Sequence, residues 1–67
     1  MTVKEKLQAF IDYGFPLSCI TRKMGVDYST LNKWLRNEKG ITHKNEERVL
    51  LTLKEISQDL MRIVGDE

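Results

Sequence analysis

Four polar side chains between residues 28 and 33 could form a surface that reads the edges of DNA bases. Tyr28, Ser29, Asn32 and Lys33 are spaced at i, i+1, i+4 and i+5, so they share one face if the segment is helical. Asn can bond adenine through two hydrogen bonds, Lys can donate to guanine, Ser can bond either base, and Tyr can pack on a thymine methyl group or bond a phosphate. We therefore predict that these four side chains contact DNA bases.

Basic residues follow this segment and are candidates for contacts with phosphates. Arg36, Lys39 and Lys44 come just after it, and Thr30 lies within it with a hydroxyl that can bond bases or phosphates. Phosphate contacts fix the position of a protein on the duplex without reading its sequence. We predict that these four residues contact the DNA backbone.

The charge distribution is consistent with a polyanionic partner for the first two-thirds of the chain. Residues 1–44 hold eight Lys and Arg against four Asp and Glu, a net charge of +4, whereas residues 45–67 hold three against six, a net charge of −3. The total of +1 hides this asymmetry. The first part is the one expected to meet a polyanion.

Several other chemistries have no support in the sequence. The single cysteine, Cys19, excludes an internal disulfide and is expected to be an inert side chain on a helix. Cys19 and the single histidine, His43, lie on different segments without an evident acidic partner, so we expect no catalytic triad, no enzymatic activity and no metal site. We expect no cofactor, small-molecule ligand or membrane span, and a cytoplasmic, nucleoid-associated location, because no long apolar run or signal pattern is present.

The elements that must position these residues are helices. The chain has 67 residues, enough for one domain (residues 1–67), and a domain of this size buries only about 60% of the surface that its unfolded chain exposes. Thr2 can cap a helix over residues 2–13, whose apolar positions recur at helical spacing, and Gly14 can end it in a left-handed conformation. A second helix is predicted over residues 16–24, with Ile20 and Met24 directed inward.

A short turn separates this second helix from the segment that carries the candidate base contacts. Gly25 can adopt a positive φ there, and Asp27 or Ser29 can cap a third helix over residues 28–37. Leu31, Trp34 and Leu35 form the inward stripe of that helix. The following polar segment is predicted to turn at Gly40.

The last predicted helix, over residues 43–64, carries more apolar side chains than three short helices can cover. Thr42 can cap it, and its apolar positions from Val49 to Ile63 are spaced 4, 3, 4, 3, the period of a coiled-coil seam. One alternative is that the whole stripe packs inside the monomer. The interpretation that we favour is a homodimer contact through the C-terminal half, formed by Ile56, Leu60, Met61, Ile63 and Val64.

Two helices joined by a three-residue turn that contains Gly, the second helix being polar on its outer face, are typical of a helix-turn-helix unit. The segment "MGVDYSTLNKWLRNEKG", residues 24–40, resembles the helix-turn-helix domain of the lambda-repressor and Cro family, small bacterial and phage regulators with four or five helices. The resemblance extends over about residues 3 to 56. It implies an all-α, compact, lambda-repressor-like domain.

The resemblance also assigns roles by position. Gly25 matches the turn glycine of the family, and Ser18, at the start of the second helix, would contact phosphate, as would Arg36. Thr21 stands where the family has a small residue, which fits if its hydroxyl bonds back to the preceding turn. Ser18 and Cys19 stand where the family often has glutamine.

These patterns predict a sequence-specific DNA-binding transcriptional regulator. We expect a repressor that binds double-stranded DNA as a homodimer on a near-palindromic operator, with half-sites about one helical turn apart. The alternative is a protein-binding module of the same fold, such as an antitoxin or an inhibitor of a host enzyme. The modest net charge leaves this alternative open.

Overall fold

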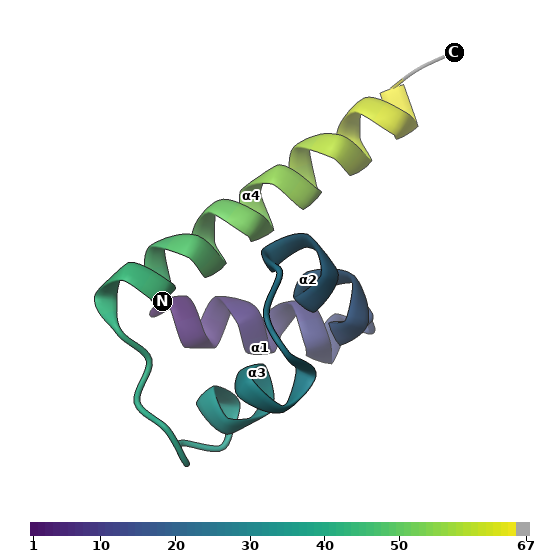
Figure 1. Ribbon diagram of the computed structural model, residues 1–67. Coiled ribbons are helices and arrows are strands. Elements are labelled where there is room, and N and C mark those ends of the chain that lie inside the picture. The colour runs from purple at the N-terminus through teal and green to yellow at the C-terminus, as the bar shows by residue number, and fades with distance from the viewer. Residues whose placement is uncertain (66–67) are drawn as a thin grey trace.

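The computed structural model describes residues 1–65 and consists, over that range, of four α-helices without a strand (Figure 1). The predicted all-α class is therefore confirmed. The helices are α1 (Val3–Tyr13), α2 (Leu17–Met24), α3 (Tyr28–Leu35) and α4 (His43–Gly65). Asp66 and Glu67, at the end of the predicted domain, lie outside the described residues.

Helix α1 begins and ends at the residues that the sequence indicates. The Thr2 hydroxyl accepts a hydrogen bond from the Glu5 N–H at 3.1 Å, and the Glu5 carboxylate accepts one from the Thr2 N–H at 2.9 Å. Two N–H groups that lack partners within the helix are thereby satisfied. Gly14 ends the helix with a φ of 109°, as predicted. The bonds from Thr2 favour the ionised carboxylate and so lower the pKa of Glu5.

We expect that Thr2→Ala lowers the free energy of unfolding by about 1 kcal/mol, because the cap is lost. The charge of Glu5 should add an acid-dependent part. Its folded pKa lies below the ordinary value of 4.5, so its contribution is complete above that pH and is lost as the pH falls through the folded pKa. Urea unfolding between pH 7 and about pH 3 measures both effects. The stability difference between the parent chain and Glu5→Gln should shrink toward low pH, and a difference that stays constant would contradict this assignment.

Helices α2 and α3 are joined by the short turn predicted at Gly25. This residue has a φ of 74°, and its N–H donates to the Thr21 carbonyl at 2.8 Å. The Thr21 hydroxyl donates to the Ser18 carbonyl at 3.0 Å, which confirms the predicted bond to the preceding turn. Helix α3 ends at Leu35, two residues earlier than predicted, and in the polar segment after it Asn37 adopts a positive φ of 62°.

The core draws on all four helices. Its buried apolar residues are Leu7, Ile20, Met24, Leu31, Trp34, Val49, Leu53 and Ile56. The buried hydroxyl of Thr52 donates to the Arg48 carbonyl at 2.8 Å, so it leaves no unsatisfied donor in the core. Phe10 and Phe15 pack edge to face beside this core, with ring centroids 5.8 Å apart.

Helix α4 spans the domain and continues beyond it. Thr42 caps its start, where the hydroxyl accepts from the Asn45 N–H at 3.2 Å, as predicted. In Figure 1 the first half of α4 packs on the other helices, and the second half projects away from them. None of the helices in residues 1–65 has both the length and the apolar character that crossing a membrane requires.

Candidate nucleic-acid interface

Helix α3 turns its apolar side into the core and its polar side outward. Leu31 and Trp34 are buried, whereas Tyr28, Ser29 and Lys33 are exposed. Asn32 is half-buried, so its amide lies at the edge of the exposed face rather than at its centre. The structure therefore brings the four predicted base-contacting residues together on one helix.

The side chains on this face are not engaged within the domain. No side-chain hydrogen bond among residues 1–65 uses Tyr28, Ser29, Asn32 or Lys33. Their hydroxyl, amide and ammonium groups are donors and acceptors available to a ligand. Helix α3 thus has one side of buried apolar residues and an opposite side of polar groups that are open to a ligand.

The predicted phosphate contacts are distributed over three helices and one loop. Ser18 is exposed at the start of α2, Arg36 and Lys39 lie in the loop after α3, and Lys44 lies in the first turn of α4. Figure 1 shows this loop leading away from α3 toward the start of α4. Thr30 is half-buried and therefore less available to a phosphate than the other four.

The basic residues of this region are not neutralised by the rest of the described chain. The ion pairs among residues 1–65 join Lys23 to Asp59, Arg62 to Asp59 and His43 to Glu47. Lys33, Arg36, Lys39 and Lys44 take part in none of them. Their positive charge is therefore presented to solvent around α3 and the loop.

The loop that carries Arg36 and Lys39 is fixed by bonds that the sequence pattern did not reveal. The Lys33 carbonyl accepts from the N–H groups of Glu38 at 2.9 Å and Lys39 at 3.3 Å. The Lys4 ammonium group on α1 donates to the Asn37 side chain. These bonds hold the loop against the end of α3 and against α1, and the bond from Lys4 to Asn37 joins residues 33 apart in sequence, too far for a local pattern to indicate.

Asp27 departs from its predicted role as a helix cap. It occupies the N-cap position of α3 with extended backbone angles, but its carboxylate makes no capping hydrogen bond. The carboxylate is instead exposed at the N-terminal end of α3, where the helix dipole favours a negative charge. A phosphate that approached this end would meet that charge.

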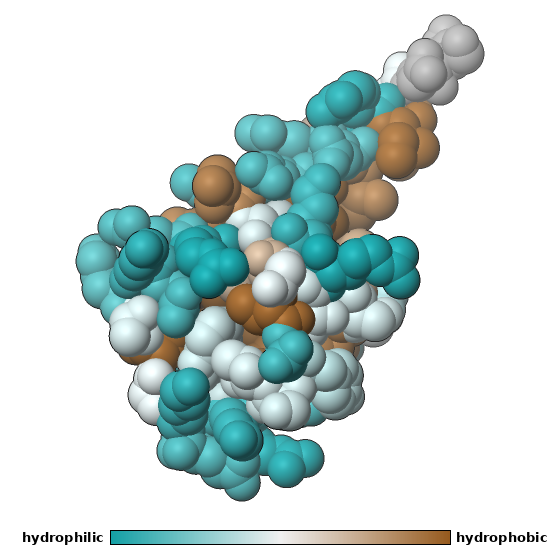
Figure 2. All heavy atoms as spheres, viewed as in Figure 1, coloured by the Kyte–Doolittle hydropathy of each residue, from teal (hydrophilic) through white to brown (hydrophobic). Residues whose placement is uncertain are grey.

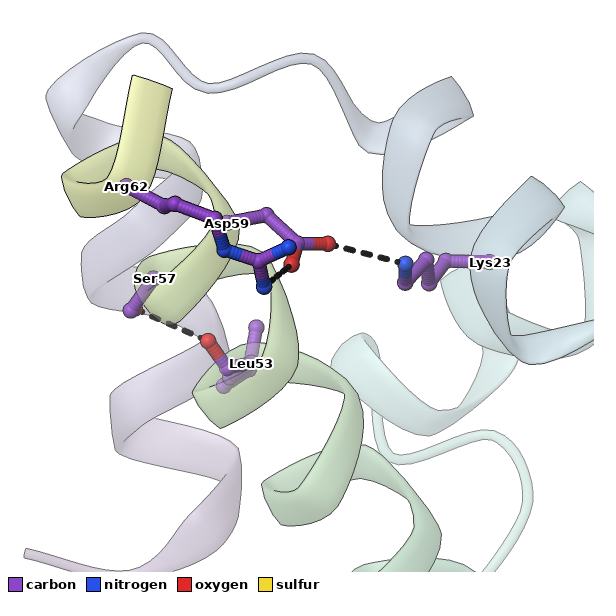
Figure 3. Close-up of polar contacts among 5 residues, drawn as sticks. All are labelled: Lys23, Leu53, Ser57, Asp59 and Arg62. Atoms are coloured by element: carbon purple, nitrogen blue, oxygen red, sulfur yellow. Dashed lines mark hydrogen bonds and ion pairs between the residues drawn. The ribbon is translucent and has the colours of Figure 1, made fainter. Parts of the chain in front are cut away.

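Two long-range contacts hold α2 against α4. Because α3 packs on α2, these contacts also help to position α3. The Arg48 guanidinium donates to the Met24 carbonyl at the end of α2 at 2.9 Å and to the Asn45 side chain at 3.1 Å. Lys23 of α2 reaches Asp59 of α4 at 3.1 Å (Figure 3). A cation at a helix C-terminus is favoured by the helix dipole, so Arg48 stabilises the end of α2 in two ways. Neither contact is predicted by the helical periodicity of the sequence.

Of the five residues predicted for the dimer interface, four are exposed on the C-terminal half of α4 and one is buried. Met61 and Val64 are 77% and 84% exposed, and Leu60 and Ile63 are exposed as well, so the alternative in which the whole stripe packs inside the monomer is wrong. Ile56 is 5% exposed and belongs to the core, so its assignment to the dimer interface is wrong. Figure 2 shows hydrophobic side chains along one side of the projecting end of α4.

The histidine and the cysteine lie on helices other than α3. His43 has an acidic neighbour that the sequence analysis did not identify, since its Nε2 lies 3.1 Å from a Glu47 carboxylate oxygen, but both side chains are well exposed. Cys19 is a free, half-buried thiol. Within residues 1–65, no three His, Cys, Asp or Glu side chains are grouped as metal binding requires.

We compared the chain with known protein families, with curated proteins and with solved structures, and none of these comparisons gives a match.

Proposed function

We propose that the chain is a sequence-specific DNA-binding regulator that acts as a homodimeric repressor on a near-palindromic operator. The observation that carries this proposal is the exposed polar face of α3, where Tyr28, Ser29 and Lys33 stand free of internal hydrogen bonds while Leu31 and Trp34 anchor the helix. Base readout requires such a face, because each base edge presents its own pattern of donors and acceptors in the major groove.

The relation of α2 to α3 supports a helix-turn-helix unit. Both helices have eight residues, the turn begins at Gly25 with a positive φ, and Ile20 and Met24 of α2 are buried with Leu31 and Trp34 of α3. In such a unit the second helix enters the major groove while the first crosses the DNA backbone. The proposed lambda-repressor-like and Cro-like architecture, with four helices, rests on this unit and on the sequence resemblance.

The basic residues supply affinity in this proposal. Lys33 and Arg36 lie at the end of α3, and Lys39 follows in a loop held by hydrogen bonds. Phosphate contacts release counterions, so binding should weaken as salt rises. Ser18 would add a neutral phosphate contact from the start of α2, and Lys44 one from α4.

Repression would be steric. A dimer that covers its operator would exclude polymerase or a competing regulator from the same DNA. This mechanism needs no cofactor, no small-molecule ligand and no catalytic group. It places the protein in the cytoplasm with the nucleoid.

A protein-binding role is the second candidate, and one observation favours it. The carboxylate of Asp27, which makes no capping hydrogen bond, lies at the end of α3 that would approach DNA, where it would repel phosphate. In this alternative α3 would contact another protein, as an antitoxin or an enzyme inhibitor would.

Selection from random double-stranded DNA with the purified chain separates the two candidates. We expect an enriched inverted repeat whose half-site centres lie about 10 bp apart. Selection at low salt that enriches no motif would contradict the DNA-binding proposal and favour the protein-binding one.

Substitutions in α3 should separate base contacts from phosphate contacts. We expect Asn32→Ala and Lys33→Ala each to lose about 1 to 3 kcal/mol of binding free energy, and mainly at particular base pairs. Arg36→Ala should weaken binding to all sequences alike and reduce the slope of log affinity against log salt by about one. Binding isotherms on the selected operator and on single-base variants, at several salt concentrations, measure these effects. If Asn32→Ala and Arg36→Ala gave the same profile, the assignment of the base-reading face would be wrong.

A further inference from the structure

A groove runs between α1 and α4 and leads to the projecting end of α4. One part of it, of about 310 Å³, is lined almost wholly by apolar atoms of Ala9, Phe10, Tyr13, Phe15 and Leu60. The other part, of about 360 Å³, shares Phe10 and lies over the middle of α4, and its lining also includes Lys6, Leu50, Leu53, Lys54, Ser57 and Gln58. The groove is therefore apolar along its floor and carries two lysines at the end remote from Leu60.

We propose that this groove receives the projecting end of α4 from a second copy of the chain, with the two α4 helices antiparallel. This inference rests on the homodimer of the proposed function and specifies its contact surface. Leu60 lines the groove and also begins the exposed apolar end of α4, so the groove and the end that would fill it are continuous. A surface that carries both parts is self-complementary, as the two-fold interface of a dimer requires.

The side of α4 that faces the groove is suited to close helix packing. Ser57, Leu60, Met61 and Val64 lie at i, i+3, i+4 and i+7, which is one stripe of a helix. Ser57 is small, and its hydroxyl donates to the Leu53 carbonyl at 2.8 Å (Figure 3), so a partner helix that covers it leaves no unsatisfied hydroxyl donor. Met61 and Val64, the most exposed members of the stripe, would then fill the partner's groove beside Tyr13, which is 92% exposed.

The charges along α4 favour the antiparallel direction. Lys6 and Lys54 flank the groove and take part in no ion pair among residues 1–65. In a parallel pair the two Lys54 side chains would face each other, and like charges repel.

The acidic residue within the projecting half of α4 is already engaged elsewhere. Asp59 accepts from Lys23 at 3.1 Å and from Arg62 at 2.8 Å. Figure 3 shows Asp59 directed toward α2, whereas Ser57 lies on the side of α4 near α1. Asp59 therefore does not oppose the entry of an apolar partner into the groove.

The mass of the full-length chain in solution, measured without DNA, tests the groove. We expect a dimer at about 100 μM and expect Met61→Lys to raise the dimer dissociation constant about a hundredfold. Ile63→Lys is the matched control, since Ile63 is 69% exposed but lies two residues from Met61, about 200° around the helix, and hence on the opposite side of α4 from Met61. Far-UV circular dichroism should show that both variants remain helical.

Charge reversal tests the direction of the helices. Mixing the Lys54→Glu variant with the parent chain should give no preference for the mixed dimer over the two homodimers in native mass spectra, because the two positions 54 lie apart in the antiparallel pair. Lys44→Glu makes the same change of charge outside the groove and should leave the dimer unchanged. A mixed dimer favoured about three- to tenfold would mean that the two positions 54 face each other, and it would overturn the antiparallel arrangement.

Two further outcomes would overturn the proposal as a whole. One is a full-length chain that is monomeric at about 100 μM. The other is a dimer that Ile63→Lys weakens as strongly as Met61→Lys. Neither outcome depends on DNA. An enriched operator found with a monomeric chain would reject the groove proposal but not DNA binding. A dimer that depends on the groove, found without an enriched motif, would reject DNA binding but not the groove proposal.

Discussion

Trp34→Ala should leave most of the chain unfolded at room temperature. Trp34 is 5% exposed and lies on the inward side of α3, in a core to which residues 1–65 contribute eight buried apolar side chains. Truncation of a buried aromatic side chain costs about 3 to 5 kcal/mol, and a chain of this size has a total stability of about the same magnitude. Loss of far-UV circular dichroism and of the cooperative urea transition would report the effect.

Tyr28→Ala is the matched control, because it truncates an aromatic side chain on the same helix. Tyr28 is 58% exposed, so its loss should change the free energy of unfolding by less than about 0.5 kcal/mol. A folded Trp34→Ala variant with stability close to that of Tyr28→Ala would show that α3 is not anchored through its tryptophan. The proposed rigid presentation of the base-reading face would then lose its basis.

Ile56→Ala should also destabilise the domain strongly, by about 2 to 5 kcal/mol. Ile56 is buried in the core, at the point along α4 where the packed half of the helix ends and the projecting half begins. Truncation of its side chain leaves a cavity in the core. The effect should be present in the monomer, because the side chain packs within its own chain. Urea unfolding at concentrations well below the dimer dissociation constant measures it without a contribution from association.

Leu51→Ala provides the comparison for Ile56. Leu51 lies on the same helix but is exposed, so its truncation should cost less than about 0.5 kcal/mol. If Ile56→Ala changed the association of the chain while leaving the stability of the monomer unaltered, Ile56 would belong to the interface after all, and its place in the core would be wrong.

Local sequence signals predicted the helices well, because the residues that begin and end them act on their own neighbours. Thr2, Gly14, Gly25 and Thr42 each perform the predicted role through bonds or backbone angles within a few residues. The end of α3 was predicted less well. The helix ends at Leu35 rather than at Asn37, and Asn37 adopts a positive φ, a conformation that Asn accepts more readily than most residues with a side chain.

The contacts that fix the helices relative to one another could not be predicted in the same way. Arg48 bonds Met24 across 24 residues, and Lys23 bonds Asp59 across 36. Such pairs depend on how the folded helices cross, which helical periodicity does not specify. The same reason explains the error at Ile56, since the spacing of the apolar stripe on α4 does not show where the cover of the other helices ends.

Helix α4 has no hinge. It runs from His43 to Gly65 without an internal proline or glycine, a length of about 34 Å, and joins the packed core to the projecting apolar end in one piece. In the proposed dimer the separation and the relative rotation of the two α3 helices would therefore be fixed by a stiff connection. An added or deleted base pair between the half-sites turns them by about 35° around the duplex, which such a protein could not follow. Its operators would be defined by the spacing of their half-sites as strictly as by their bases.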